Sequence, residues 1–227
     1  MNNKEVHRYV MKRFDTFFRE NGFARQGNGR WASSTEEIIR EVILHFSYGQ
    51  ECFDFDIVVQ PWCVPEDDVY LTVSVRLSRF AGDRVWGSYD ENKLEEDIKD
   101  ALLVMERDGL GLFRRVSDCL SLARVIDRTG INIFTVSPVE KARLFAYIYF
   151  YKHKFLRAWK WYRKYSRSGF GAVSDTDNFA RLQKYAEEGE YEKVDGFFRE
   201  TFKENAEKFG LNCRIPWDSE GSGSGEV

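Results

Sequence analysis

Residues 38–80 alternate between apolar and polar side chains, and this pattern constrains the fold more than any other feature of the chain. In its third run, apolar residues take every second position: Val69, Leu71, Val73, Val75 and Leu77. Because successive side chains of a strand point to opposite faces, such a run predicts a strand with one apolar and one polar face. Residues 41–48 and 53–60 alternate in the same way, and only short polar links join the three runs. Short links favour antiparallel neighbours, so we predict a meander.

The segments around this meander supply a cover for its apolar face. Residues 3–21 place apolar side chains at helical spacing, and a second amphipathic helix is predicted to begin at Asp90 and to reach about residue 105. Residues 23–33 are predicted to form one short strand that carries a turn. We therefore expect residues 1–108 to form a two-layer unit, a four-stranded antiparallel meander with both helices on one face.

Beyond residue 109 the apolar period becomes helical. Residues 112–126 carry one apolar stripe, and Ser137-Pro138-Val139-Glu140 is typical of a helix start, with Ser at the N-cap, Pro in the first turn and Glu three residues on. The expected helices form two antiparallel hairpins, over 138–151 with 155–167 and over 175–188 with 191–209. The predicted fold class is α+β, with a helical unit over 109–211 packed on the first unit in one continuous core, and a mostly disordered tail over 212–227.

Composition narrows the class of protein. With 227 residues and a formal net charge of -3, the chain is long enough for a large core and has no overall basic excess that would indicate nucleic acid. The charged first twenty residues lack the pattern of a signal peptide, and the longest apolar run, 144–151, is far shorter than the roughly 20 residues of a membrane span. Four scattered cysteines without a CxxC pair favour reduced thiols. We expect a cytoplasmic protein without membrane association.

The sequence lacks the familiar catalytic motifs, including the P-loop, the dinucleotide-binding glycine pattern, HExxH and GxSxG. We therefore predict no catalytic residues, no metal site and no cofactor. One arrangement leaves an alternative open, because His45 is expected on the polar sheet face together with Asp54 and Asp56. A His flanked by carboxylates could hold a divalent cation in a metal-dependent hydrolase or nuclease-like enzyme. The simpler interpretation is a cross-strand polar pair on a solvated sheet.

Acidic residues dominate two segments, 51–68 and 90–100, and give the first candidate binding surface. The predicted acidic patch consists of Asp54, Asp56, Glu66, Asp67, Asp68, Glu95 and Glu96. Complementary charge steers protein association, so such a patch favours a protein partner.

The opposite charge gathers in residues 140–167, which contain nine Lys or Arg residues and one Glu, and Trp159, Trp161, Tyr162 and Tyr165 stand among the basic residues. The predicted basic patch is represented by Lys160, Arg163 and Lys164. Basic and aromatic side chains together can bind nucleic acid through phosphate contacts and base stacking. The other interpretation is that the aromatic rings fill the core while the basic stems cover them.

The N-terminal half also resembles a bacterial protein family. A helix containing Phe14, Phe17 and Phe18 is followed by the run Gly22-Phe23-Ala24-Arg25-Gln26-Gly27-Asn28-Gly29-Arg30-Trp31 and then by alternating strands. This order resembles domain of unknown function family 4304, over about residues 4–130. The resemblance supplies no catalytic residues. Families of this kind include immunity proteins of bacterial toxin systems, which implies a binding role.

These observations lead to one principal hypothesis and two alternatives. We predict a non-enzymatic module that binds another protein, with an immunity-type inhibitor of a bacterial toxin as the first candidate. The alternatives are the metal-dependent hydrolase on the acidic sheet face and nucleic-acid binding by the basic hairpin, of which we favour neither. The sequence determines neither the identity of the partner nor the oligomeric state.

Overall fold

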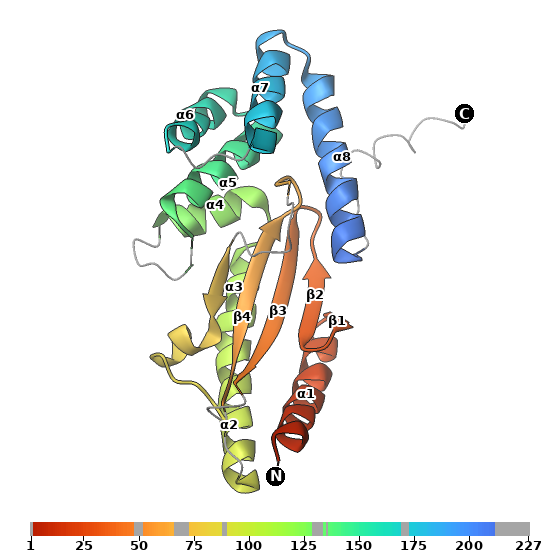
Figure 1. Ribbon diagram of the computed structural model, residues 1–227, viewed down its shortest axis with the longest axis vertical. Coiled ribbons are helices and arrows are strands. Elements are labelled where there is room, and N and C mark those ends of the chain that lie inside the picture. Colours follow the sequence, from red (N-terminus) through yellow and green to blue (C-terminus); the bar gives the residue numbers. More distant parts are fainter. Residues whose placement is uncertain are drawn as a thin grey trace, which may run out of the picture.

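The computed structural model describes residues 2–47, 52–65, 73–87, 90–128, 134, 136–168 and 173–211. The molecule is elongated, with the sheet and its helices at one end and a helical bundle at the other (Figure 1). The first part contains α1 (Asn3–Glu20), β1 (Ala24–Gly27), β2 (Arg30–Ser34), β3 (Ile38–Ser47), β4 (Cys52–Pro61), β5 (Ser74–Arg76), the 3₁₀ segment η1 (Leu77–Ala81) and α2 (Glu91–Val104). Beside the sheet the chain continues through the π-helical segment η2 (Met105–Gly109) into α3 (Leu110–Arg115). The other end contains α4 (Cys119–Arg128), α5 (Pro138–Tyr151), α6 (Phe155–Ser166), α7 (Val173–Glu187) and α8 (Tyr191–Phe209).

The strands form the predicted antiparallel meander. In the described part of the chain the sheet has five strands in the order β1-β2-β3-β4-β5, one more than predicted. The additional strand arises because residues 24–34 form a hairpin, with Arg25 opposite Trp31. Gly27 and Gly29 make its turn with φ values of 133° and 77°, which a residue with a side chain rarely adopts. The turn that we expected within one strand therefore separates two strands, β1 and β2.

The third alternating run forms only a short strand. Its residues 69–72 lie outside the described part of the chain, and β5 ends at Arg76, where η1 begins. Asp54 of β4 accepts hydrogen bonds from both the backbone N–H and the hydroxyl of Ser78, at 3.1 and 2.6 Å. These bonds fasten the 3₁₀ turn to β4.

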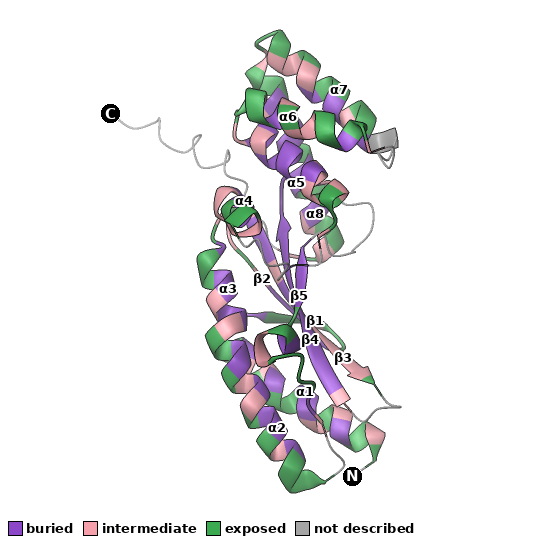
Figure 2. Ribbon diagram, turned by 90° about the vertical axis from the view of Figure 1, so that its left-hand side faces the viewer, coloured by how far each residue is buried: buried purple, intermediate pink, exposed green. Residues whose placement is uncertain are grey.

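Both predicted helices of the first unit cover the same face of the sheet. Figure 2 shows α1 and α2 side by side beneath the strands. The ring of Phe14 in α1 lies 4.4 Å from that of Phe55 in β4, and both side chains are fully buried. Burying one such side chain stabilises a fold by about 1.5–3 kcal/mol. Glu95 of α2 accepts hydrogen bonds from Tyr9 and Arg13 of α1, at 2.8 and 2.7 Å, which joins the two helices.

The second amphipathic helix is longer than predicted. It continues from α2 through η2 into α3, and so passes the predicted unit boundary at residues 108 and 109 without a break. The predicted helix over 112–126 is instead divided into α3 and α4. The division follows from Asp118, whose carboxylate accepts the Ser121 N–H at 2.8 Å and begins α4 anew.

The predicted helical hairpins are present as α5 with α6 and α7 with α8. Ser137 and Glu140 form the expected capping box at the start of α5. A buried carboxylate, that of Asp175 in α7, fastens the bundle: it accepts hydrogen bonds from Tyr147 of α5 at 2.8 Å and from Tyr165 of α6 at 2.7 Å. Arg143 of α5 supplies the opposite charge, with its Nε 2.6 Å from the same carboxylate.

The two ends of the molecule meet around the C-terminal end of β4. Asn205 of α8 is 1% exposed and donates hydrogen bonds to the carbonyl groups of Trp62 and Val64, at 2.8 and 2.9 Å. Glu37, beside β3, accepts the N–H of Cys119 in α4 at 3.0 Å and forms an ion pair with Lys152 at the end of α5. Buried apolar residues of both ends belong to one continuous cluster.

Two further findings concern expectations from composition. Cys63 and Cys119 are buried at this junction as free thiols, with their sulfur atoms 3.7 Å apart. Burial raises the pKa of the Cys119 thiol. Within the described ranges, no helix combines the length and the apolar character that crossing a membrane requires.

The junction at Asn205 generates the first prediction. Asn205→Leu keeps the side-chain size but leaves two buried carbonyl groups without a donor, and each such loss costs about 1–3 kcal/mol. We expect the free energy of unfolding, measured by urea denaturation, to fall by at least about 2 kcal/mol. Lys203→Ala, at an exposed position of the same helix, is the control. Equal stability of the two variants would contradict the role assigned to Asn205.

Candidate functional site

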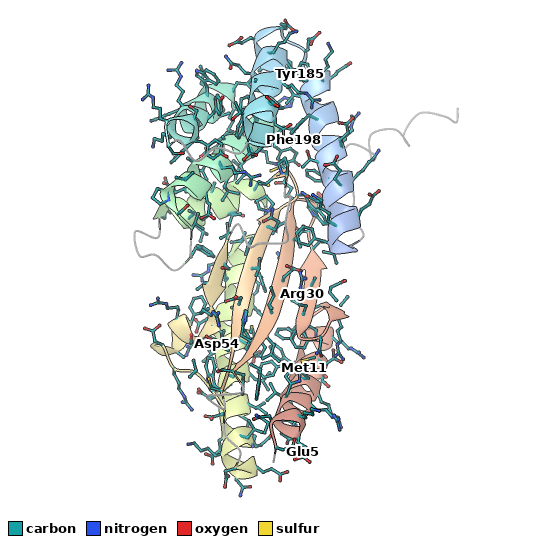
Figure 3. The ribbon with its side chains drawn as sticks, in the orientation of Figure 1. Glu5, Met11, Arg30, Asp54, Tyr185 and Phe198 are labelled. Atoms are coloured by element: carbon teal, nitrogen blue, oxygen red, sulfur yellow. The ribbon has the colours of Figure 1, made fainter. Side chains whose placement is uncertain are left out.

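Two members of the predicted acidic patch, Asp54 and Asp56, lie on the face of the sheet opposite the helices. Figure 3 shows Asp54 and Arg30 on this face, which we call the outer face. The prediction that these carboxylates face solvent is wrong, because Asp54 is 6% and Asp56 7% exposed. Glu41 and Gln60, predicted on the same solvated face, are buried as well.

Basic side chains from neighbouring strands cover the carboxylates of the outer face. Asp56 forms an ion pair with Arg76 of β5 at 2.8 Å and a hydrogen bond with His45 of β3 at 2.6 Å. Glu41 of β3 is paired with Arg30 of β2 at 2.6 Å. Burial raises the pKa of Glu41, and the adjacent Arg30 opposes that rise. The outer face is thus a row of ion pairs within the chain, in which the acids lie beneath the bases.

The hydrolase alternative requires His45 and Asp56 to lie close together, and in the structure they do. They are, however, bonded to each other and not arranged around a cation site. Their partners occupy the oxygen atoms on which cation binding would depend: Arg76 and His45 take the two oxygens of Asp56, and Ser78 takes those of Asp54. Over the described ranges, no group of three His, Cys, Asp or Glu side chains is arranged to hold a metal ion. The geometry therefore adds no support to the hydrolase alternative.

The remaining members of the predicted acidic patch do not join Asp54 and Asp56. Glu66, Asp67 and Asp68 lie outside the described residues. Glu95 is bonded to Tyr9 and Arg13 of α1, on the helical side of the sheet, while Glu96 is exposed. Among the described members, Glu96 alone is an exposed carboxylate, so they form no single acidic surface.

The predicted basic patch, in contrast, is assembled on one helix. Six cationic side chains on and beside α6 are exposed: Lys154, Arg157, Lys160, Arg163, Lys164 and Arg167. We call them the α6 basic face. Residues 154–168 contain no Asp or Glu, and none of the six cations has a carboxylate within ion-pair distance in the part of the chain that the structure describes. Six unpaired like charges repel one another, so this helix favours an anionic partner.

Aromatic rings beneath the α6 basic face hold the cations in place. The Lys164 ammonium lies 4.0 Å from the centre of the Trp161 ring, and the Arg163 guanidinium lies 5.2 Å from that of Trp159. On the inner side, the Trp161 ring packs against Phe145 of α5 at 4.7 Å, and Tyr162 packs against Phe179 of α7 at 4.8 Å. The Trp161 ring is thus contacted both by a cation and by the core, which agrees with the interpretation of basic stems over an aromatic core.

Leu156 is the unexpected member of this surface. It is 92% exposed, the highest value among the exposed large apolar residues of the described chain. It falls in the same helical stripe as Lys160 and Arg163, four and seven residues further on. Beside it opens a mostly apolar pocket of about 180 Å³, with two polar residues of α7, Gln183 and Glu187, in its lining. The other lining residues are Phe150, Phe155, Leu156, Trp159 and Ala186. An apolar anchor and an apolar pocket thus adjoin the α6 basic face.

Comparison of the chain with protein-family models, curated proteins and solved structures found no match. The resemblance of residues 4–130 to domain of unknown function family 4304 therefore remains a prediction. What this protein does has to be argued from its own surface.

The sequence contained a signal for Leu156 that the prediction overlooked. Leu156 lies four residues before Lys160, in a helical stripe that is otherwise basic, so the spacing predicts that this apolar side chain is exposed. The pocket beside it could not be predicted, because Gln183 and Ala186 reach it from α7.

The outer face generates the second prediction. Asp54→Asn places an amide where the Ser78 N–H and O–H need an acceptor, and loss of a hydrogen bond to a buried charged group costs about 1.5–3 kcal/mol. We expect a decrease of that size in the free energy of unfolding. The control Glu96→Gln alters an exposed member of the same predicted patch and should change stability by less than about 0.5 kcal/mol. An unchanged stability of Asp54→Asn would instead indicate a carboxylate reserved for binding.

Proposed function

We propose that this protein is a binding module that holds an acidic, partly apolar segment of another protein against α6. The observation that carries the proposal is the exposure of Leu156 within the α6 basic face. A charged surface alone fits any polyanion, whereas a fully exposed leucine beside an apolar pocket gains free energy only when an apolar group covers it.

The aromatic residues favour a protein over a nucleic acid. Single-stranded nucleic acid binds through bases that stack on free aromatic faces. Here Trp161 and Tyr162 pack against Phe145 and Phe179, and a cation lies over Trp161. Arg, Trp and Tyr next to an apolar anchor are instead the residues that carry the energy of protein interfaces.

The chemistry of the surface specifies the partner. Its acidic side chains would pair with Lys160, Arg163 and Lys164, and a large apolar side chain would enter the pocket between α6 and α7. Burying Leu156 contributes about 1.5–3 kcal/mol, or roughly tenfold to a hundredfold in affinity. The cations contribute mainly to the rate of association and to specificity.

The narrower proposal, an immunity-type inhibitor of a bacterial toxin, comes from the sequence. Its original support, an acidic patch, is weakened because Asp54, Asp56 and Glu95 are bonded within the chain. A basic face would suit a toxin with an acidic docking surface. The identity of a protein captured from the host by the wild type, and lost with the α6 variants, tests this proposal. Capture of a protein without toxic activity would reject it.

The third prediction concerns α6. The probe is a fluorescent peptide with one Phe between runs of Glu, and the measurement is fluorescence anisotropy. Leu156→Glu should weaken binding at least about tenfold, because it removes the apolar anchor and adds repulsion. A triple variant with Glu at Lys160, Arg163 and Lys164 should abolish binding. A second peptide with Ala in place of Phe should bind the wild type more weakly, and Leu156→Glu should reduce the difference between the two peptides.

Control variants separate this surface from overall charge. Lys93, Lys99 and Lys203 are exposed on other helices, and their change to Glu alters net charge as much as the triple variant does. We expect the control triple variant to bind the Phe peptide within about twofold of the wild type. Equal loss in both triple variants would contradict the proposal. Tighter binding of a single-stranded oligonucleotide than of the Phe peptide, insensitive to Leu156, would favour the nucleic-acid alternative.

A further inference from the structure

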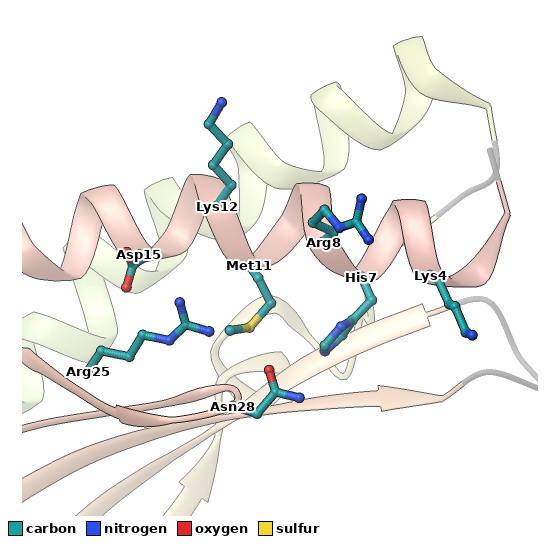
Figure 4. A pocket seen from close by; sticks show the side chains of 8 residues that line it. All are labelled: Lys4, His7, Arg8, Met11, Lys12, Asp15, Arg25 and Asn28. Atoms are coloured by element: carbon teal, nitrogen blue, oxygen red, sulfur yellow. The ribbon is translucent and has the colours of Figure 1, made fainter.

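A groove of about 540 Å³ lies between α1 and the β1–β2 hairpin, far along the chain from α6 (Figure 4). Lys4, Arg8 and Lys12 line it from the helix, and Arg25 and Asn28 line it from the hairpin. In Figure 4 the Arg25 side chain extends along the groove towards Met11, and the Asn28 amide lies between Arg25 and His7. No feature of the α6 basic face takes part in it.

The groove carries a cationic excess that the chain does not neutralise. Lys4, Arg8 and Lys12 are exposed, and their side chains have neither an ion pair nor a hydrogen bond within the described ranges. One carboxylate, that of Asp15, lies at the same groove. It already binds Arg19 at 2.9 Å and the Trp31 indole N–H at 3.0 Å. The groove is thus lined by four cations, Lys4, Arg8, Lys12 and Arg25, and by one carboxylate, which is already bonded to Arg19 and Trp31.

Local backbone geometry fixes the hairpin side of the groove. The Arg25 Nε–H donates to the carbonyl group of Gly27 at 3.0 Å, so the guanidinium is restrained while its terminal nitrogens remain available. Gly29 brings the turn close to the sheet, because a Cβ added there would lie 3.3 Å from the Cβ of Leu44. Arg25 and Asn28 are therefore presented at a defined distance from α1 instead of on a loose loop.

We propose that this groove binds a small molecule that bears more than one phosphate group. Arginine presents a planar fork of donors that matches phosphate oxygens, and a restrained arginine loses little entropy on binding. Residues four apart on a helix are separated by about 6 Å along its axis. Lys4, Arg8 and Lys12 therefore follow one another along about 12 Å of the helix axis at the rim of the groove, with the Lys12 side chain directed away from Arg25 in Figure 4. A single phosphate would reach only part of this row.

The size and the floor of the groove agree with a small ligand. Sites for small molecules commonly measure about 300–1,000 Å³ and combine apolar walls with a few polar groups. Met11, 6% exposed, forms an apolar floor, and the ring of His7 packs edge-on against Phe46 at 5.5 Å. Burial lowers the pKa of His7. The Asn28 amide provides both a donor and an acceptor for the remainder of the molecule.

The fourth prediction is measured by isothermal titration calorimetry with the full chain. Inorganic tripolyphosphate should bind with one site per chain, and orthophosphate at least about tenfold more weakly. Arg25→Ala should weaken tripolyphosphate binding at least about tenfold, and Arg8→Glu should weaken it more by reversing a charge. Both side chains are exposed, so these variants should unfold at the wild-type temperature in the absence of ligand.

The α6 triple variant described above serves as the matched control, because it loses three exposed cations elsewhere. It should keep tripolyphosphate affinity within about twofold of the wild type. Loss of binding in this variant but not in Arg25→Ala would overturn the proposal, as would equal affinity for orthophosphate and tripolyphosphate. A nucleoside triphosphate that binds more tightly than tripolyphosphate would assign a role to Asn28 and Met11, and Asn28→Ala should then remove the difference. The result is independent of peptide binding at α6, so either proposal can fail alone.

Discussion

The carboxylates of Asp54, Asp56 and Glu41 are buried on the outer face of the sheet, and their partners come from β2, β3, β5 and η1. A buried charge without a partner costs several kcal/mol, so each acid requires a base or several donors within reach. Asp54 accepts hydrogen bonds from Ser78 of η1 and from the N–H of Phe55. Arg76, the last residue of β5, forms an ion pair with Asp56. The inner face of β4 is covered by aromatic residues such as Phe14, so β4 is buried on both sides.

A strand buried on both faces provides a rigid base to which the helical end can attach. The chain leaves β4 at Pro61, and its next carbonyl groups, those of Trp62 and Val64, are held by Asn205 of α8. At the same junction, Glu37 accepts the Cys119 N–H of α4 and forms an ion pair with Lys152 at the end of α5. The helical bundle is therefore tied to the sheet by polar bonds within a shared apolar cluster. This leaves α6, on the far side of α5 and away from the sheet, with an exposed face that no contact of the junction needs (Figure 1).

The positions of the helices and strands could be predicted from the sequence more accurately than the burial and the contacts of their side chains. Capping signals located α5 within a residue, because Ser137, Pro138 and Glu140 act locally. Alternation located β3 and β4 for the same reason. It could not show that the polar face of β4 is buried, because that depends on Arg30, Arg76 and His45 reaching it from other strands. Lys160, Arg163 and Lys164 were predicted as a patch because helical spacing alone places them together, whereas the pocket and the groove need residues from two elements each.

The α6 basic face and the groove beside α1 both carry cations, but they differ in the other groups that they offer to a ligand. The chain has 37 acidic and 34 basic residues, and both signs of charge occur unpaired on its described surface. Cations gather at α6 and at the groove beside α1, whereas Asp54, Asp56, Asp175 and Glu95 are bonded within the chain. With a net charge of -3 the chain as a whole does not favour anions, so attraction of an anion depends on these local clusters of cations. Once an anion is in contact, α6 offers an apolar anchor, whereas the groove offers a restrained arginine. That difference makes the two surfaces suited to different ligands despite their common charge.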